Sequence, residues 1–254
     1  MKKILLKTPF ARPLKKAEAL FQKSKIFNYS NNEIVNNKTT YCISPYKTGT
    51  TFLSSGFDSK ISDHEPMHYL SLCELENNFN NFFIKKLNFL DLKLECSGVL
   101  SAYIDELNSN EIAKNLDYIC ILREPSKWVS SVLNYWQKLD YLAFDYINDL
   151  FWKDKVGVNL IDFNSNTEKE KIIIINNLIE FYLNFTQDTF KIKNIRHVQI
   201  NNLEDYAKNE LSVKLGENFN LSKVFKRENK KKKIYNNINA DEKYKQILLK
   251  EGIK

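Results

Sequence analysis

The sequence predicts an α/β fold in which a largely parallel sheet is flanked by helices. Short apolar runs alternate with helical patterns along the chain, and this alternation is typical of parallel sheets. Strands are expected over residues 39–44, 92–97, 117–122 and 195–200, with a helix over 13–24 and helices after the first three strands. A long helix is expected from about Thr167 to Thr186, where Thr167 and Glu170 match a capping box.

Length and composition indicate one domain. The chain has 254 residues, of which 43% are hydrophobic and 27% charged, and this is enough to bury one substantial core. We therefore expect a single domain over 1–254, with an N-terminal helical extension over 1–38 and a basic loop over 225–237. The net charge of +7 favours anionic partners, but it does not distinguish a phosphorylated nucleotide from a nucleic acid.

The cysteines and the N-terminus suggest a compartment. The four cysteines, at positions 42, 73, 96 and 120, form no C-x-x-C pair, so they are expected to be apolar core residues in a reducing compartment. The segment MKKILLKTPFARP has too short an apolar run for a signal peptide, and no stretch has the length of a membrane span. We expect a cytoplasmic protein without a membrane span.

The most informative segment is YCISPYKTGTTFL, residues 41–53. An apolar strand runs into a loop of small residues that contains Lys47 and leads to a helix. Such a loop can bind phosphate through its backbone N–H groups, the helix N-terminus and the lysine. In the common ATP and GTP loops the lysine follows the last glycine, whereas Lys47 precedes Gly49, so an ordinary kinase or GTPase is a weaker interpretation.

A second motif follows the strand DYICIL, which ends at Arg123. Pro125 then opens a helical pattern that contains Ser131. If the helix begins near Pro125, Ser131 lies about 9 Å along its axis. A single anion could therefore contact both Arg123 and Ser131. The alternative is that each motif is structural: a capped helix in the first case and a solvated or ion-paired arginine in the second.

Together the two motifs resemble those of sulfotransferases that use 3′-phosphoadenosine 5′-phosphosulfate (PAPS). The first family motif is Pro-Lys-Ser/Thr-Gly-Thr-Thr, and the chain matches it with one extra residue, Tyr46. The second is an arginine at a strand end with a serine eight positions later. The resemblance covers mainly residues 39–136. It implies that the 5′-phosphosulfate is held by Lys47, Thr48, Gly49, Thr50 and Thr51, that Arg123 and Ser131 hold the 3′-phosphate, and that Phe52 lies near the adenine.

The segment SDHEPMHYL allows two interpretations. His64, Glu65 and His68 spell HExxH, which on one helix would bind zinc. Pro66 argues against a shared helix, because proline is tolerated only in the first turn and disfavours helical angles in the residue before it. The third histidine, His197, lies in an expected strand. We therefore expect no metal site.

The same segment resembles the Glu-Pro pair of carbohydrate sulfotransferases. The resemblance implies that Glu65 is the base that accepts the proton of the acceptor hydroxyl, a role favoured by partial burial and a raised pKa. His64 is the rival base, because histidine titrates nearest to neutral pH. In the structural alternative, Glu65 is a carboxylate at a helix start. His68 is expected to be a packing or acceptor-site residue.

Two segments depart from the cytosolic small-molecule sulfotransferases. LECSGVLSAY has no histidine where those enzymes carry their catalytic one, and Ser97 and Gly98 there could bring the backbone close to donor or acceptor. The late basic run FKRENKKKKIYNN replaces a glycine-containing motif that closes over the 3′-phosphate. Arg227, or one of Lys230 to Lys233, could take that role; the alternative is a solvated surface loop.

The expected function is sulfuryl transfer from PAPS to a hydroxyl, with adenosine 3′,5′-bisphosphate (PAP) as product and a glycan or glycolipid as acceptor. The expected absence of a membrane anchor points to a free, bacterial-type enzyme. The alternatives are a non-catalytic α/β protein that binds a polyanion or nucleic acid through its basic run, and an ATP-dependent kinase with a P-loop-like fold. The aromatic segment DYLAFDYINDLFW is either core packing or a sugar-binding wall.

Overall fold

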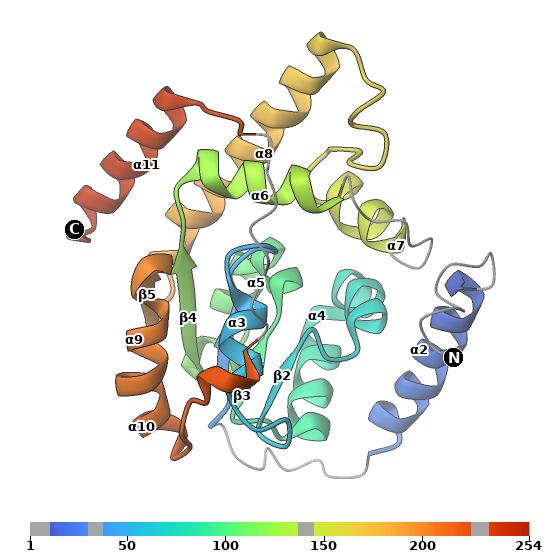
Figure 1. Cartoon of the computed structure of the whole chain (residues 1–254). Coiled ribbons are helices and arrows are strands. Elements are labelled where there is room, and N and C mark those ends of the chain that lie inside the picture. Colours follow the sequence, from blue (N-terminus) through green and yellow to red (C-terminus); the bar gives the residue numbers. More distant parts are fainter. Residues whose placement is uncertain (1–10, 30–37, 137–144, 225–233, 254) are drawn as a thin grey trace.

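The computed structural model describes residues 11–29, 38–136, 145–224 and 234–253. Its centre is a five-stranded sheet with the order β2-β3-β1-β4-β5, in which every neighbouring pair is parallel (Figure 1). The strands are β1 (Thr40–Cys42), β2 (Ser62–His64), β3 (Leu94–Cys96), β4 (Asp117–Leu122) and β5 (Ile195–Gln199). The α/β class and the parallel sheet predicted from the sequence are confirmed.

The strand β2 was missed by the sequence prediction. It has only three residues, Ser-Asp-His, and lies at the edge of the sheet, where it pairs with β3 alone. So short and polar a segment carries neither the apolar run nor the alternation by which strands are recognised. The four predicted strands are all present, although β1 and β3 are shorter than expected.

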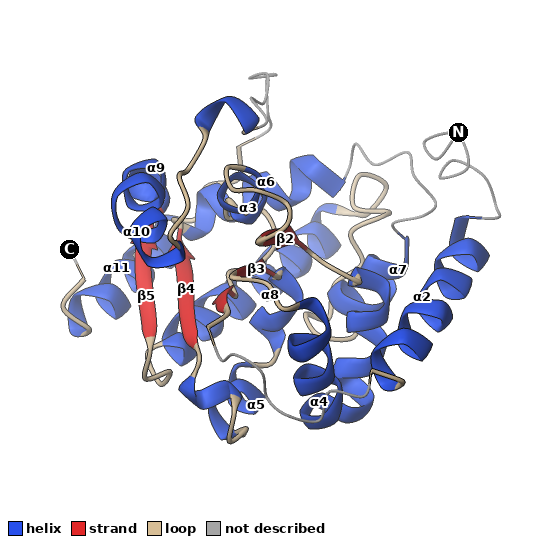
Figure 2. Cartoon of the chain, turned by 90° about the horizontal axis from the view of Figure 1, so that it is seen from below, coloured by secondary structure: helices blue, strands red, loops and turns tan. Residues whose placement is uncertain are grey.

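Helices surround the sheet (Figures 1 and 2). They are α2 (Ala11–Phe27), α3 (Thr50–Ser55), α4 (His68–Leu90), α5 (Ile104–Ser109), α6 (Pro125–Trp136), α7 (Asp145–Ile147), α8 (Glu168–Thr189), α9 (Leu203–Tyr206), α10 (Ser212–Leu215) and α11 (Ile238–Lys250). Short 3₁₀ turns include η1 (Gly98–Ala102), η2 (Ala113–Asn115), η5 (Ile200–Asn202) and η7 (Leu221–Lys223), and η4 (Asn148–Lys153) and η6 (Ala207–Leu211) are π-helical. The predicted capping box of α8 is confirmed, since Thr167 and Glu170 bond reciprocally.

The two faces of the sheet are buried by different helices. Alternate residues of β4 point to opposite faces, as the two-residue period of a strand requires. Tyr118 and Cys120 join a large cluster built from α2, α4, α5, α6, α8 and α11. Ile119 and Ile121 join a smaller one with α3, α9 and α10. The sheet is therefore covered on both faces, which is the usual setting of parallel strands.

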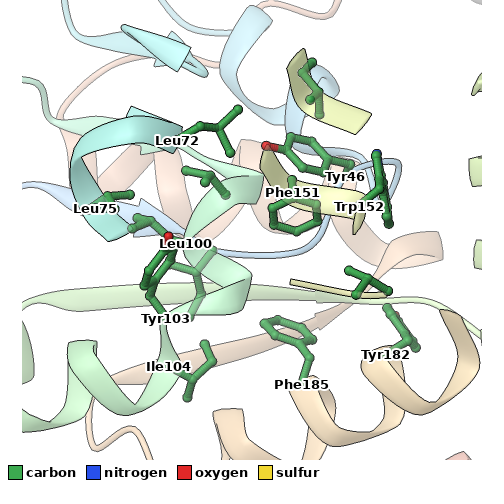
Figure 3. Packing of buried hydrophobic residues seen from close by; sticks show 14 of the residues in the cluster. Tyr46, Leu72, Leu75, Leu100, Tyr103, Ile104, Phe151, Trp152, Tyr182 and Phe185 are labelled. Carbon is green, nitrogen blue, oxygen red and sulfur yellow. The ribbon is translucent and has the colours of Figure 1, made fainter. Parts of the chain in front are cut away.

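Three aromatic residues of the described stretch 145–152 pack in the core. Tyr146, Phe151 and Trp152 are buried, and Figure 3 shows Phe151 and Trp152 beside Tyr46. The ring of Tyr46 meets that of Phe151 edge-on at 4.8 Å between centroids and lies 5.8 Å from that of Trp152. For these residues the core-packing interpretation is correct. In the described parts of the chain, no helix combines the length and the apolar character that crossing a bilayer would require.

Candidate functional site

The loop from Ser44 to Gly49 leaves the carboxyl end of β1, which lies between β3 and β4. From β1 the chain goes first to one side of the sheet, for β2 and β3, and then to the other, for β4 and β5. The strand order therefore changes direction at β1. Open parallel sheets bind ligands beyond the carboxyl ends of the strands at such a point, so the loop occupies the position in this fold where a ligand is expected.

The loop has an unusual backbone. Lys47 has a φ of 73° and Gly49 a φ of 122°, both in the left-handed region. Lys47 is not a glycine, so this conformation costs of order 1 kcal/mol, and such strain is found most often at functional sites. A Cβ on Gly49 would lie 3.1 Å from Cδ2 of Leu203, so this position also needs glycine for space. Inside the loop, the Thr48 hydroxyl donates to the carbonyl of Pro45 at 2.7 Å.

The helix that follows the loop is short. α3 has six residues, and its N-cap, Gly49, provides no side-chain hydrogen bond. The dipole of so short a helix is small, so the helix N-terminus contributes less positive potential than the sequence suggested. The positive charge at the loop comes chiefly from side chains.

The two sequence motifs meet at this loop. Nη1 of Arg123, at the end of β4, donates a 2.8 Å hydrogen bond to the carbonyl of Lys47. The backbone N–H of Arg123 donates to the hydroxyl of Tyr182 at 2.9 Å, which ties the strand end to α8. Ser131, eight residues after Arg123, is half-buried on α6. Arg123 and Lys47, 76 residues apart in the chain, are therefore in direct contact.

The ammonium group of Lys47 lies over an aromatic ring. Its Nζ is 3.6 Å from the ring centroid of Tyr135, near the end of α6. This is cation–π geometry, and Tyr135 is 37% exposed. The lysine side chain is thus held on the α6 side of the loop.

His64 also contacts the loop region. Its Nε2 lies 3.1 Å from the hydroxyls of both Thr50 and Thr51, at the start of α3. Of these threonines, Thr51 is exposed and Thr50 is buried. Phe52 is half-buried, and its ring lies 5.4 Å from that of Phe219. The rival base, His64, is therefore placed directly against the loop.

Glu65 has a different environment. Its Oε1 accepts a 2.7 Å hydrogen bond from the backbone N–H of Gly98, and its Oε2 is buried without a hydrogen-bond partner. Burial raises the pKa of Glu65 to about 8, although the bond from Gly98 and the charge of Lys86 act in the opposite direction. The structural alternative placed Glu65 at the start of the helix that follows it in the chain. That helix, α4, begins only at His68, and the carboxylate instead accepts from the first N–H of η1.

The HExxH spacing does not form a helical zinc motif. His64 ends β2 and His68 begins α4, and Glu65 and Met67 on either side of Pro66 both have left-handed φ angles, of 55° and 54°. The prediction that the two histidines do not share a helix face is confirmed. Within the described residues, no group of three or more His, Cys, Asp or Glu side chains is arranged to hold a metal ion. His197, on β5, forms a hydrogen bond with the hydroxyl of Thr189 at the end of α8.

Two pairs near Glu65 were not anticipated from the sequence. Lys86 and Glu95 form a buried ion pair at 2.7 Å, and His68 bonds to the hydroxyl of Tyr46 at 2.7 Å. The one available signal for the first pair was Glu95 itself, a charged residue in an apolar strand, since such residues are almost never buried without a partner. The second pair joins the start of α4 to the extra residue of the loop.

The basic run lies largely outside the described residues. Arg227 and Lys230 to Lys233 fall there, so their predicted role stays a prediction. The described residues on either side contact the end of α3 and the middle of α6. The N–H of Asn220 donates to the carbonyl of Gly56, just after α3, and the N–H of Tyr235 donates to the Ser130 hydroxyl on α6.

A cavity of about 550 Å³ lies elsewhere, between α5 and α8, and no residue of the loop lines it. Its wall includes the acidic residues Asp105, Glu106, Glu180 and Asp188. Comparison with family models, curated proteins and solved structures gives no match to the chain.

Proposed function

We propose that the chain is a sulfotransferase with a P-loop-like donor loop, which transfers the sulfuryl group of PAPS to a hydroxyl. The observation that carries the proposal is the hydrogen bond from Arg123 to the Lys47 carbonyl. It joins two motifs whose resemblance to the family was noted separately, and it does so where the strand order changes direction. Either the phosphate-binding loop or the arginine by itself would be much weaker support for the proposal.

The residues present fit an anionic donor. At Gly49 there is no room for a side chain, so the backbone there is bare. Lys47 has a strained backbone, and Arg123 lies next to it. In the proposed mechanism Lys47 neutralises charge on the leaving phosphate, while loop N–H groups and the exposed Thr51 hydroxyl hold phosphate oxygens. Arg123 and Ser131 would hold the 3′-phosphate of the donor, and Phe52 would lie beside its adenine. The bound donor supplies the sulfuryl group; the protein positions it and stabilises charge, by analogy with phosphoryl transfer.

We assign the base to Glu65. Its Oε2 has no hydrogen-bond partner, and its raised pKa, about 8, suits a group that must take a proton near neutral pH. Because Oε2 is buried, an acceptor hydroxyl reaches it only after the neighbouring side chains move. His64 then has a supporting role, in which it orients the hydroxyls of Thr50 and Thr51. The acceptor class, a glycan or glycolipid hydroxyl, rests on the resemblance of the Glu-Pro segment alone.

The test is calorimetric binding of PAP, the desulfated donor. We expect micromolar binding by the wild type, weakened about tenfold or more in Lys47→Ala and Arg123→Ala, since each removes a charged partner of phosphate. Arg196→Ala is the matched control: this arginine is exposed on β5 and pairs with Glu210 at the surface. Absence of PAP binding, or preference for ATP with Mg²⁺, would overturn the proposal. Binding of polyanions that is lost on deleting Lys230 to Lys233 but insensitive to Lys47 would favour the nucleic-acid alternative.

A further inference from the structure

A chain of three hydrogen-bonded side chains lies beside Glu65. The hydroxyl of Tyr46 is 2.7 Å from Nε2 of His68, and Nδ1 of the same ring is 3.1 Å from the hydroxyl of Tyr146. Tyr46 belongs to the loop after β1, His68 begins α4 and Tyr146 belongs to α7. Both tyrosines are more than 90% buried. The two ring nitrogens of His68 therefore each have a tyrosine hydroxyl as partner.

The middle member of this chain also faces the carboxylate. Nε2 of His68 is 3.6 Å from Oε2 of Glu65, the oxygen that lacks a hydrogen-bond partner. Burial, together with the charges of His64, Lys86 and Lys15, lowers the pKa of His68 to about 3. The ring is therefore neutral at physiological pH, with one N–H and one acceptor nitrogen.

The position of that single N–H depends on Glu65. When the carboxyl group is protonated, Nε2 can accept from the Tyr46 hydroxyl while Nδ1–H donates to Tyr146. When Glu65 is anionic, the tautomer with the proton on Nε2 is favoured, because Nε2–H then points its positive end toward Oε2 as well as toward Tyr46. The ring loses a proton at one nitrogen and gains one at the other, so its charge does not change.

We propose that His68 is a positioning residue that couples the protonation of Glu65 to the donor loop by reversing the direction of its hydrogen bond with Tyr46. In the Nε2–H state Tyr46 is the acceptor, and its own O–H can turn to another partner. Tyr46 is the residue by which this loop departs from the family pattern, and its carbonyl accepts from Nε1 of Trp128 at 2.8 Å. This bond anchors the backbone of Tyr46, so the change in hydrogen-bond direction is expected at its hydroxyl. The coupling itself stands on these contacts, whereas its use in catalysis rests on the proposed sulfotransferase function.

Other titratable groups act on the same pair. Those that face Glu65 or His68 from the packed elements are Lys15 of α2, Cys42 of β1, His64 of β2, Lys86 of α4, Glu95 and Cys96 of β3, and the two tyrosines. Lys86 and Glu95 are tied to one another. Oε2 of Glu65 lies 3.6 Å from Nε2 of His68, and the pKa of Glu65, about 8, lies within the pH range in which the change is expected.

The experiment is nitrogen NMR of protein labelled with ¹⁵N in its histidines. The chain has three, so the ring signals can be assigned by substitution, and His197, whose ring bonds to Thr189, serves as the internal reference. Between pH 6 and pH 9 we expect the His68 tautomer ratio to change about tenfold or more toward Nε2–H, as a charge-assisted hydrogen bond would require. The change should vanish in Glu65→Gln. A constant ratio in the wild type, or a change that persists in Glu65→Gln, would overturn the proposal.

A second variant separates this role from simple packing. Tyr46→Phe keeps the ring against Phe151 and Trp152 but removes the hydroxyl. Nε2 of His68 then loses its bond to Tyr46 and keeps its contact with Oε2 of Glu65. The midpoint of the tautomer change should move to lower pH, and so should the acid limb of the rate profile. Tyr118→Phe, whose hydroxyl bonds to Ala113 instead, should change neither. If PAP fails to bind while the NMR result holds, the proposed function is wrong and the coupling stands.

Discussion

Oε1 of Glu65 accepts a 2.7 Å hydrogen bond from the backbone N–H of Gly98, and a side chain at position 98 would collide with the same carboxylate. A Cβ there would lie 3.0 Å from Oε1 and 2.9 Å from Cδ1 of Tyr46. Glycine at this position therefore permits the close approach of three segments: the donor loop, the Glu-Pro turn and the start of η1. The carboxylate is fixed from one side by backbone, and its other oxygen is left for chemistry.

Gly98→Ala should destabilise the protein by about 1 to 3 kcal/mol, the usual cost of forcing an extra methyl group into a packed site. The free energy of unfolding from urea titrations measures the change. Ser109→Ala, at an exposed position of α5, is the control and should alter stability by no more than about 0.5 kcal/mol. If Gly98→Ala leaves the free energy of unfolding unchanged, the Tyr46 ring moves away from the added methyl group without loss of stability.

Glu65 makes stability depend on pH. Its pKa in the folded state, about 8, is above the ordinary 4.5, so between these values the folded protein keeps a proton that the unfolded chain has released. The unfolding free energy should therefore fall as the pH rises through this interval. Above pH 7, where His68 is neutral in both states, Glu65→Gln should remove most of the remaining decline. The full shift corresponds to of order 5 kcal/mol.

Chemical denaturation at half-unit steps from pH 5 to pH 9 would check this. Glu106→Gln, on the exposed face of α5, is the matched control and should leave the slope unchanged. An identical slope in the wild type and Glu65→Gln would show that Glu65 titrates normally, and the assignment of this residue as base would lose its electrostatic support.

Lys86→Met should destabilise the chain by about 3 to 5 kcal/mol, because it leaves the Glu95 carboxylate buried without its partner. Glu95→Gln in the same chain should restore much of this loss. Lys208→Met breaks a surface pair with Glu204 instead and should change stability by less than about 1 kcal/mol. The urea midpoints of the three variants and the wild type give the comparison. Equal losses at Lys86 and Lys208 would contradict the burial argument.

Tyr135→Leu should tighten PAP binding by about two- to fivefold. The ammonium of Lys47 lies over the Tyr135 ring, and leaving it to reach a phosphate costs about 0.5 to 1 kcal/mol. Tyr135→Phe keeps the ring face and should resemble the wild type in the same calorimetric titration. Weaker binding in Tyr135→Leu would instead place the ring in the donor site itself.

The sequence was most informative where local pattern determines structure. The alternation of Tyr118, Ile119 and Cys120 between the two faces follows from the period of a strand, and the capping box at Thr167 depends on residues three positions apart. Local pattern also placed Lys47 and Arg123 each directly after a strand, and their contact in the structure follows because the carboxyl ends of parallel strands share one edge.

The contacts that were missed depend on register and on packing between distant segments. Glu95 of β3 meets Lys86 of α4, and His68 at the start of α4 meets Tyr46, the inserted residue of the loop. Neither partner can be identified from spacing along the chain. The short strand β2 was missed because its place is determined by pairing with β3, which its own three residues do not indicate.

The central position of β1 has a consequence for synthesis of the protein. Both of its neighbours, β3 and β4, come later in the chain, so β1 has no sheet partner while it leaves the ribosome. The loop after it is held by Arg123, which follows the last residue of β4. The nascent chain therefore cannot assemble the loop after β1 until β4 has emerged, and an early translational stop or a slow codon cluster before that point would leave the loop residues exposed to proteases.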